Sequence, residues 1–365
     1  MSQQNITGNY GSLAARTGGT VSKTKGFNLD ATLEPTDIAK ALRTFAVKTP
    51  VAIAGEVKVN AKITGKQPIV AATFASTKPV TVDRLILNQV QGKIKTKDFT
   101  TLEFSRIKAT SGNVDAAIQG EGQLRLPTAK KAGSTLFAFN VTGVDAEKVA
   151  KLYDAKLPAA IGSVNAAVQV YGSLDNIQVL TQFDAPDAAY PAIGELLIAN
   201  NVLTVRNTTV QFPAGAAAVN GTLDLMGNRS WRAQLTSDNI PLSALAANQR
   251  GRVSGTVELE SPSGSFEIDK IVAQADLNFA NAVAAIPDAI ETRLNWDGKS
   301  LFVPSLQVGD YLTAKGRVDL AVNAQKVPTA VSGIDLDLTL AQSQSQSAQC
   351  LCPFSICQYR RYPKF

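Results

Sequence analysis

Apolar and polar residues alternate along most of this chain. In the stretch 56–63, every second residue from Val57 to Ile63 is apolar, and the residues between them are polar. Successive side chains of a β-strand point to opposite faces, so this pattern predicts a strand with one apolar and one polar face. The same alternation is found at 162–171, 255–260, 276–279 and 293–297. We therefore expect antiparallel β-sheet with one apolar side.

A glycine-led strand recurs along the chain with a nearly constant spacing. The leading glycines are Gly19, Gly122, Gly221 and Gly316, which are separated by 103, 99 and 95 residues. A turn follows each glycine-led strand, and an alternating strand comes next, at 27–33, 136–141, 231–235 and 334–340 in turn. A period of this length indicates an array of supersecondary units that bury their apolar faces by stacking on one another.

One short helix is expected in each complete unit, directly after the alternating strand. The predicted helices cover 38–45, 146–153 and 240–245, each after a residue of a capping type, Asp37, Asp145 or Asn239. Within each segment, apolar residues recur at helical spacing. We expect such a helix to plug or cross the sheet once per unit. Roughly seven or eight strands of meander should then follow before the next glycine-led strand.

These features predict a mostly β fold, a long antiparallel sheet of about three units of roughly 100 residues, each with one short helix. Twisted open sheets rarely exceed about ten strands without curling, so this sheet should roll into an elongated trough, or β-taco. The expected units are 27–126, 127–225 and 226–320, with the end of a preceding unit at 1–26, the start of a fourth at 321–341 and an aberrant or disordered tail at 342–365. The chain is thus interpreted as an interior part of a longer array.

The composition limits the chemistry that the chain can perform. Apolar residues make up 45% of it, enough for a sizeable core, but there is no histidine. This excludes Ser-His-Asp and Cys-His catalysis and histidine metal sites. The sequence also has no glycine-rich phosphate loop after a strand and no nucleophile elbow. We therefore interpret the protein as one that is not an enzyme and uses no cofactor.

The three cysteines, Cys350, Cys352 and Cys357, all lie in the last 16 residues. Three thiolates could bind a soft metal, but a fourth ligand is absent and the tail resembles nothing upstream. A reading-frame shift, a truncated gene end or a disordered tail is favoured over a metal site. No run of about 20 apolar residues predicts a membrane-spanning helix, and residues 1–30 lack the apolar stretch of a secretion signal. Any targeting segment is expected to lie beyond this chain.

Charge is distributed unevenly along the sequence. Residues 1–131 carry a net charge of +10, residues 132–341 one of −7, and the last 24 residues one of +3. The basic first third could favour anionic headgroups or an acidic partner. Its lysines mostly alternate with apolar residues, however, which favours a solvated strand face. Nucleic-acid binding has little support, because no run of Lys and Arg is interleaved with aromatic residues.

These units resemble the TamB branch of the AsmA-like envelope proteins. The likeness is carried by the strand 231–235 with the helix 240–245, by the glycine-led strands 251–257 and 219–225, and by 194–198 leading to 203–205. It covers about residues 10–341. Its motifs are degenerate and hydrophobic, so they transfer no catalytic or ligand-binding residue to this chain.

The resemblance implies a protein of the periplasm that is anchored in the inner membrane and bridges the envelope. It implies an outer-membrane barrel partner of the TamA type, and an apolar groove that carries phospholipid acyl chains. Proteins of this family are also described as assisting outer-membrane protein assembly and protein secretion. The family's N-terminal anchor and C-terminal domain are absent here, so membrane association would depend on segments outside this chain.

Our leading hypothesis is that the apolar sides of the strands line a groove for phospholipid tails. Small residues such as Ala61, Ala166 and Ala167 should leave width in it. Two alternatives stay open, a β-solenoid stalk or adhesin with a dry core, and a truncated or frameshifted fragment without independent activity. The candidate lining residues are Val57, Val59, Ile63, Val164, Val168, Leu223, Leu225, Val318 and Leu320.

Overall fold

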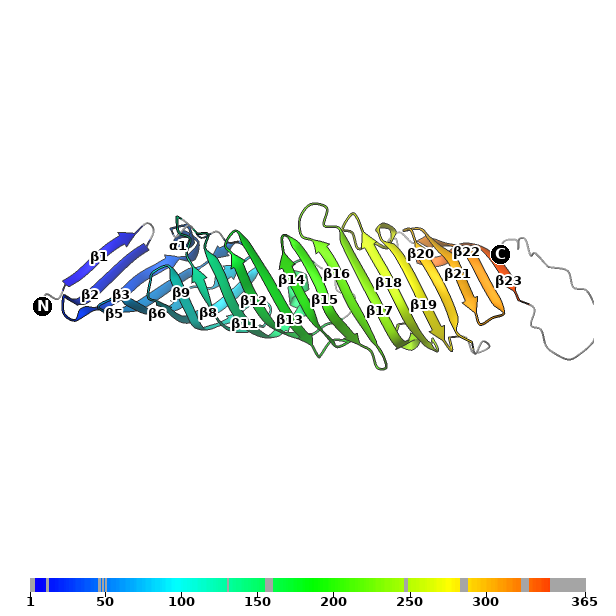
Figure 1. The fold of residues 1–365 in the computed structure, drawn as a ribbon, viewed down its shortest axis with the longest axis horizontal. Coiled ribbons are helices and arrows are strands. Elements are labelled where there is room, and N and C mark those ends of the chain that lie inside the picture. Colours follow the sequence, from blue (N-terminus) through cyan, green and yellow to red (C-terminus); the bar gives the residue numbers. More distant parts are fainter. Residues whose placement is uncertain are drawn as a thin grey trace, which may run out of the picture.

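The protein forms one long, curled antiparallel sheet (Figure 1). The computed structural model describes residues 4–10, 13–44, 47, 49, 51–129, 131–154, 160–245, 249–282, 288–322 and 328–341. Strands make up 68% and helices 7% of the described residues, and the 23 strands found among them belong to a single sheet. The predicted fold class is confirmed. The strands lie across the long axis of the molecule, with β1 and β23 at opposite ends.

The first part of the sheet contains ten strands and one helix. They are β1 (Gln4–Tyr10), β2 (Leu13–Ser22), β3 (Gly26–Asp37), α1 (Ile38–Thr44), β4 (Ile53–Ala54), β5 (Glu56–Gly65), β6 (Ile69–Ser76), β7 (Val80–Val82), β8 (Leu85–Thr96), β9 (Thr101–Ser111) and β10 (Ala117–Arg125). The middle part comprises β11 (Ser134–Asp145), α2 (Ala146–Leu152), β12 (Ser163–Ser173), β13 (Asn176–Ala185), β14 (Ala192–Ala199), β15 (Val202–Gln211) and β16 (Ala216–Asp224).

The last part begins with a strand that leads directly into a helix. It comprises β17 (Trp231–Pro241), α3 (Leu242–Leu245), β18 (Arg252–Ser261), the 3₁₀ turn η1 (Ile268–Lys270), β19 (Val272–Ala280), β20 (Ile290–Trp296), β21 (Ser300–Val308), β22 (Leu312–Val322) and β23 (Pro328–Leu340). Every pairing among the described strands is antiparallel, and nearly all join strands that follow each other in the chain. The exceptions involve the short strands β4 and β7, which pair with each other while β3 pairs with β5 and β6 with β8.

Three strands, β3, β11 and β17, lead directly into a helix, and we call them the helix-bearing strands. Each lies six sheet positions from the next. The expectation of seven or eight further strands after each of them was therefore too high, because most strands have eight to twelve residues and fewer of them fit into a unit. Adjacent strands of an antiparallel sheet run in opposite directions, so strands that are six positions apart run in the same direction. All three helices therefore lie along the same border of the sheet. The exact boundaries of the units stay a prediction.

Side-chain caps fix the start of the first two helices. Asp37 accepts a hydrogen bond from the Lys40 backbone N–H at 2.8 Å, and Asp145 accepts one from Lys148 at 2.9 Å. Both helices start where the capping residues predict. The third helix starts at Leu242, two residues later than predicted, because Ile240 still pairs with Val253 in the sheet.

Buried apolar side chains gather near the border of the sheet that carries the three helices, which we call the helix-bearing rim. Ala217, Ile240 and Val253 form a buried cluster against which Phe212 and Leu242 pack. Halfway along the strands, most apolar side chains are only half-buried, although Val303 is buried. Among the described residues, no second sheet or long helix covers them. Burial in the described part of the chain is therefore greatest near the helices and lower along the middle of most strands.

Candidate functional site

Eight of the nine candidate lining residues lie on one face of the sheet, which we call the apolar face. In an antiparallel pair, directly opposite residues point to the same side, so the register joins strands into rows. One row begins at Val168 and ends at Val318. Its members, one from each strand from β12 to β22, are Val168, Thr181, Leu196, Val205, Gly221, Ala233, Leu259, Ala273, Trp296, Leu301 and Val318.

The other candidates lie beside this row or in its continuation. Val164 and Leu320 belong to the same faces of β12 and β22 as Val168 and Val318, and Leu223 follows Gly221 by two residues. On β5, the same face carries Val57, Val59 and Ile63, which are joined to the rest through Ala61, Ala72 and Ile94. All eight side chains are half-buried.

Two sequence-based expectations fail. Leu225 lies beyond the end of β16 and is 39% exposed, because the strand stops at Asp224 before a turn. Ala167 points to the opposite face from Ala166, since neighbouring residues of a strand cannot share a side. Ala166 itself lies on the apolar face, opposite Val141 and Phe183.

A chain of phenylalanine rings crosses the apolar face in the first half of the sheet. Phe74 lies edge-on to Phe104 with ring centroids 6.2 Å apart, and Phe104 is 5.4 Å from Phe137. Phe137 and Phe139 are stacked at 5.8 Å. The glycines on the strands between them make room for the rings. A Cβ on Gly92 would lie 2.7 Å from the ring of Phe74.

Sequence reasoning missed this aromatic row. The four rings come from β6, β9 and β11, and their contacts depend on the register between those strands. A phenylalanine opposite a glycine is a signal, but it can be recognised only once the pairing is known. The ring contacts are continuous from Phe74 to Phe139.

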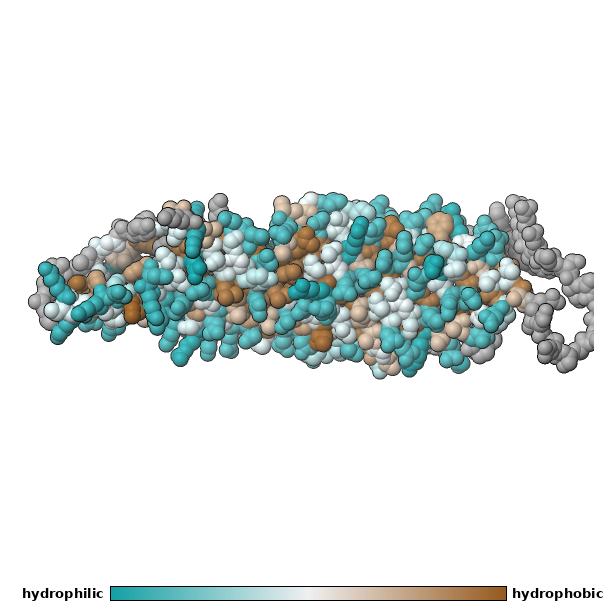
Figure 2. Space-filling view, viewed as in Figure 1, coloured by the Kyte–Doolittle hydropathy of each residue, from teal (hydrophilic) through white to brown (hydrophobic). Residues whose placement is uncertain are grey.

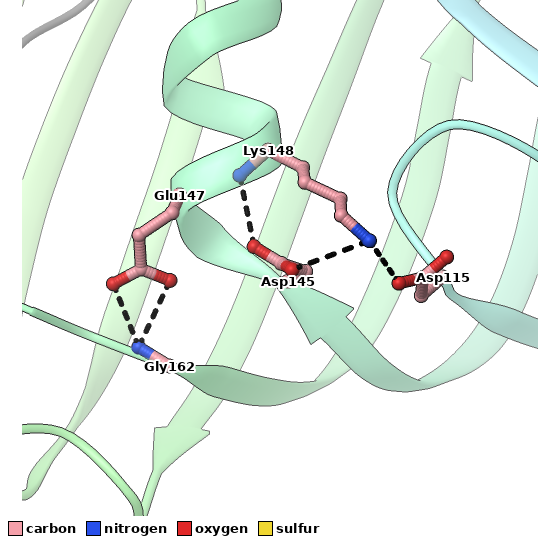
Figure 3. A network of polar contacts seen from close by, with 5 residues as sticks. All are labelled: Asp115, Asp145, Glu147, Lys148 and Gly162. Carbon is pink, nitrogen blue, oxygen red and sulfur yellow. Dashed lines mark hydrogen bonds and ion pairs between the residues drawn. The ribbon is translucent and has the colours of Figure 1, made fainter.

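Helix α2 is fixed to the rim of the apolar face by a polar network (Figure 3). Glu147 accepts hydrogen bonds from the backbone N–H of Ile161 at 2.7 Å and of Gly162 at 3.0 Å. The bonds from Gly162 and Ile161 hold the pKa of Glu147 below its ordinary value. Lys148 forms ion pairs with Asp115 and Asp145, and the hydrogen bond to Asp115 raises the pKa of Lys148.

The end of α2 is joined to the turn between β7 and β8. Arg84 donates a hydrogen bond to the Leu152 carbonyl at 2.7 Å, and its guanidinium lies 5.3 Å from the centre of the Tyr153 ring. The Tyr153 hydroxyl donates to Asp83 at 2.7 Å. Partial burial, together with this carboxylate, raises the pKa of Tyr153 to about 12. These contacts link the first two parts of the sheet across about 70 residues of sequence.

The opposite face of the sheet is polar and carries cross-strand ion pairs. Arg232 pairs with Glu260 at 3.2 Å, and Arg293 with Asp276 at 2.6 Å. A hollow of about 560 Å³ lies on this face, between the row containing Arg232 and Glu260 and the neighbouring row containing Gln234. Figure 2 shows one side of the molecule, where hydrophilic residues predominate and hydrophobic ones are visible between them. The lining of the hollow also includes five members of the row described above, namely Val205, Gly221, Ala233, Leu259 and Ala273.

No match to a known protein guides the interpretation of these faces. No family model, no curated protein and no solved structure is similar to the chain.

Groups of metal ligands and membrane-spanning helices are also not found among the described residues. Within the described ranges, no three acidic or cysteine side chains are grouped closely enough to hold a metal ion. Cys350, Cys352 and Cys357 lie outside those ranges. No helix in the described part of the chain has the length and apolar character needed to cross a bilayer.

Proposed function

We propose that the apolar face binds phospholipid acyl chains and that this chain is a carrier segment of an envelope-bridging, TamB-like protein. One observation carries the proposal. The row from Val168 to Val318 runs through eleven neighbouring strands, and nearly all of its members are apolar. Every member is half-buried rather than buried. With neighbouring strands about 4.8 Å apart, the row is roughly 50 Å long.

Acyl chains match such a surface energetically. Removing one methylene from water is worth about 0.8 kcal/mol, so a lipid tail gains several kcal/mol from an apolar strip that can cover it along its length. Movement along the strip exchanges one set of apolar contacts for an equivalent set. A face of this kind can therefore hold a tail without fixing it at one position.

The half-exposed state of the row favours an open groove over a stalk with a dry core. A dry core needs its apolar side chains packed against another layer, as at native interior density. Among the described residues, buried apolar side chains are concentrated at the helix-bearing rim instead. This supports a carrier role.

The partner and location follow from the resemblance of the glycine-led strands to TamB. The protein would act between the two membranes of an envelope, anchored in the inner membrane. An outer-membrane barrel of the TamA type would receive the lipid or the assistance in outer-membrane assembly and secretion. The chain itself would act without catalysis or cofactor.

Photocrosslinking at neighbouring residues tests the groove. A photoreactive amino acid at position 168 replaces Val168 on the apolar face, and one at position 169 replaces the exposed Gln169 on the polar face. After irradiation of cells that produce the full chain, we expect phospholipid adducts at position 168 and few at position 169, measured by mass spectrometry. Circular dichroism verifies that both variants fold alike. Equal adducts at the two positions, or none at either, would contradict the proposal.

A further inference from the structure

A cation-lined hollow lies on the polar face in the first part of the sheet. It has a volume of about 420 Å³ and is formed by residues of β5, β6, β8 and β9. Lys58, Lys93, Arg106 and Lys108 line it, and none of its lining residues is a carboxylate. Lys58 and Lys108 stand at the two ends of one register row, separated by Ala75 and Gln91. The other lining residues include the hydrogen-bonding side chains Asn60, Thr73 and Gln91.

A β-bulge brings the fourth cation into this hollow. Gln91 pairs with Lys108 and Lys93 pairs with Ser105, so β9 has an extra residue between the two pairs. Arg106, next to Ser105, has a φ of 54°. This left-handed conformation is unfavourable for a residue with a Cβ. Strained backbone that persists in a structure is often associated with a functional position.

The equivalent bulge in the middle part of the sheet contains a carboxylate. There Glu195 pairs with Arg206 before the bulge, as Lys93 pairs with Ser105, and Asn207 has a φ of 51°. Glu195 accepts hydrogen bonds from Gln182 at 3.0 Å, from Asn207 at 3.0 Å and from Arg206 at 3.1 Å. Hydrogen bonds from Gln182 and Asn207 hold its pKa below the ordinary value. A carboxylate of the chain itself thus neutralises that bulge.

The same contrast holds between the cations of this hollow and the paired arginines of the later parts of the sheet. In the middle and last parts, arginines pair with carboxylates, as Arg206, Arg232 and Arg293 do. Lys58, Lys93, Arg106 and Lys108 form no ion pair with any described carboxylate. The clustering of these cations around one hollow distinguishes them from the paired arginines of the other parts.

We propose that Lys58, Lys93, Arg106 and Lys108 form a binding site for a phosphate-bearing anion. A tetrahedral, multiply charged group suits several converging cations, with the guanidinium giving paired hydrogen bonds and the lysines acting as point charges. Asn60, Thr73 and Gln91 add neutral donors around it. Because the site is on the face opposite the acyl-chain groove, it is independent of the proposed lipid carriage.

Calorimetry with inorganic phosphate tests the site on the full chain, with sodium chloride at matched ionic strength as the control. Flotation with phosphatidylcholine vesicles, with and without phosphatidylglycerol, tests whether a lipid headgroup is the source. Two variants address the site. Lys93→Glu places a carboxylate where the equivalent bulge has Glu195, and Arg106→Asn uses the residue found at position 207. Arg106→Asn should also fold well, because asparagine tolerates the left-handed conformation.

We expect the wild-type chain to bind at least one of the two probes more strongly than the salt control explains. That binding should fall by about tenfold or more in Lys93→Glu and by about threefold to tenfold in Arg106→Asn, as expected for the loss of charge-assisted hydrogen bonds. Arg232→Asn removes a paired arginine from the same face and should leave binding unchanged.

Each outcome is decisive. Binding of inorganic phosphate identifies a soluble anion as a sufficient ligand, and binding only to phosphatidylglycerol vesicles identifies the headgroup at a membrane surface. Absence of both, or equal losses in Arg106→Asn and Arg232→Asn, would overturn the proposal. The second result would mean that the chain responds only to its total charge.

Discussion

The glycines that mark the repeat have a physical cause at the level of single atoms. A Cβ on Gly316 would collide with the Asp335 carbonyl of the neighbouring strand, and one on Gly221 would lie 2.8 Å from the Arg232 carbonyl oxygen. On Gly122, it would collide with the ring of Phe137. The period seen in the sequence is therefore a period of close approaches between strands.

Substitution of Gly122 measures the value of one such approach. Gly122→Ala should lower the free energy of unfolding by about 1–3 kcal/mol, because the added methyl group forces the Phe137 ring or the strand to move. Gly8→Ala is a matched control, since nothing lies within 4 Å of its Cβ, and it should change stability by less than about 0.5 kcal/mol. Denaturant titration measures both. Similar effects for the two substitutions would contradict this explanation.

Among the elements, helix α2 depends most visibly on charge. Glu147→Gln should weaken the contact with the N–H groups of Ile161 and Gly162 at neutral pH. The folded-state pKa of Glu147 lies below its ordinary value of 4.5, so its stabilisation is present above that pH and is lost as the pH falls through the folded-state pKa. The difference between the variant and the wild-type chain should therefore shrink in acid.

Hydrogen exchange of the α2 backbone as a function of pH checks this prediction. Glu121→Gln on the polar face of β10 is the control for a general effect of removing a carboxylate. A difference between Glu147→Gln and the wild-type chain that stayed constant between neutral and acidic pH would contradict an ionised contact.

The elements also show how far the sequence could predict the structure. Alternation between Val57 and Ile63 correctly predicted the strand and its apolar side, because a period of two survives any choice of partner strand. Register could not be derived, since it depends on bulges such as the one at Arg106. The sequence alone therefore could not predict the phenylalanine row or the position at which β16 ends before Leu225. Local capping set the start of α2, but sheet pairing of Ile240 shortened α3.

On the scale of the whole molecule, the two ends of the sheet are open edges. β23 pairs only with β22 among the described strands, and its apolar residues are unusually exposed. Ile334 is 67%, Leu338 65% and Leu340 75% exposed. An uncovered strand with a row of apolar side chains invites pairing with another chain.

A charge on this edge should reduce self-association. Leu338→Lys places a cation in the apolar row of β23, and we expect it to shift the chain toward monomer in light scattering over a range of concentrations. Thr339→Lys adds the same charge to the polar side of the strand and should have a smaller effect. A chain that is monomeric before either substitution would show that the exposed edge does not drive association.

The even spacing of the helix-bearing strands has a consequence for how such a protein can change in length. Inserting or deleting a single strand would move every later helix to the opposite border of the sheet. Gain or loss of a hairpin, or duplication of six strands at once, leaves that border unchanged. Evolution can therefore change the length of this sheet in steps of two strands while all the helices stay on the same border.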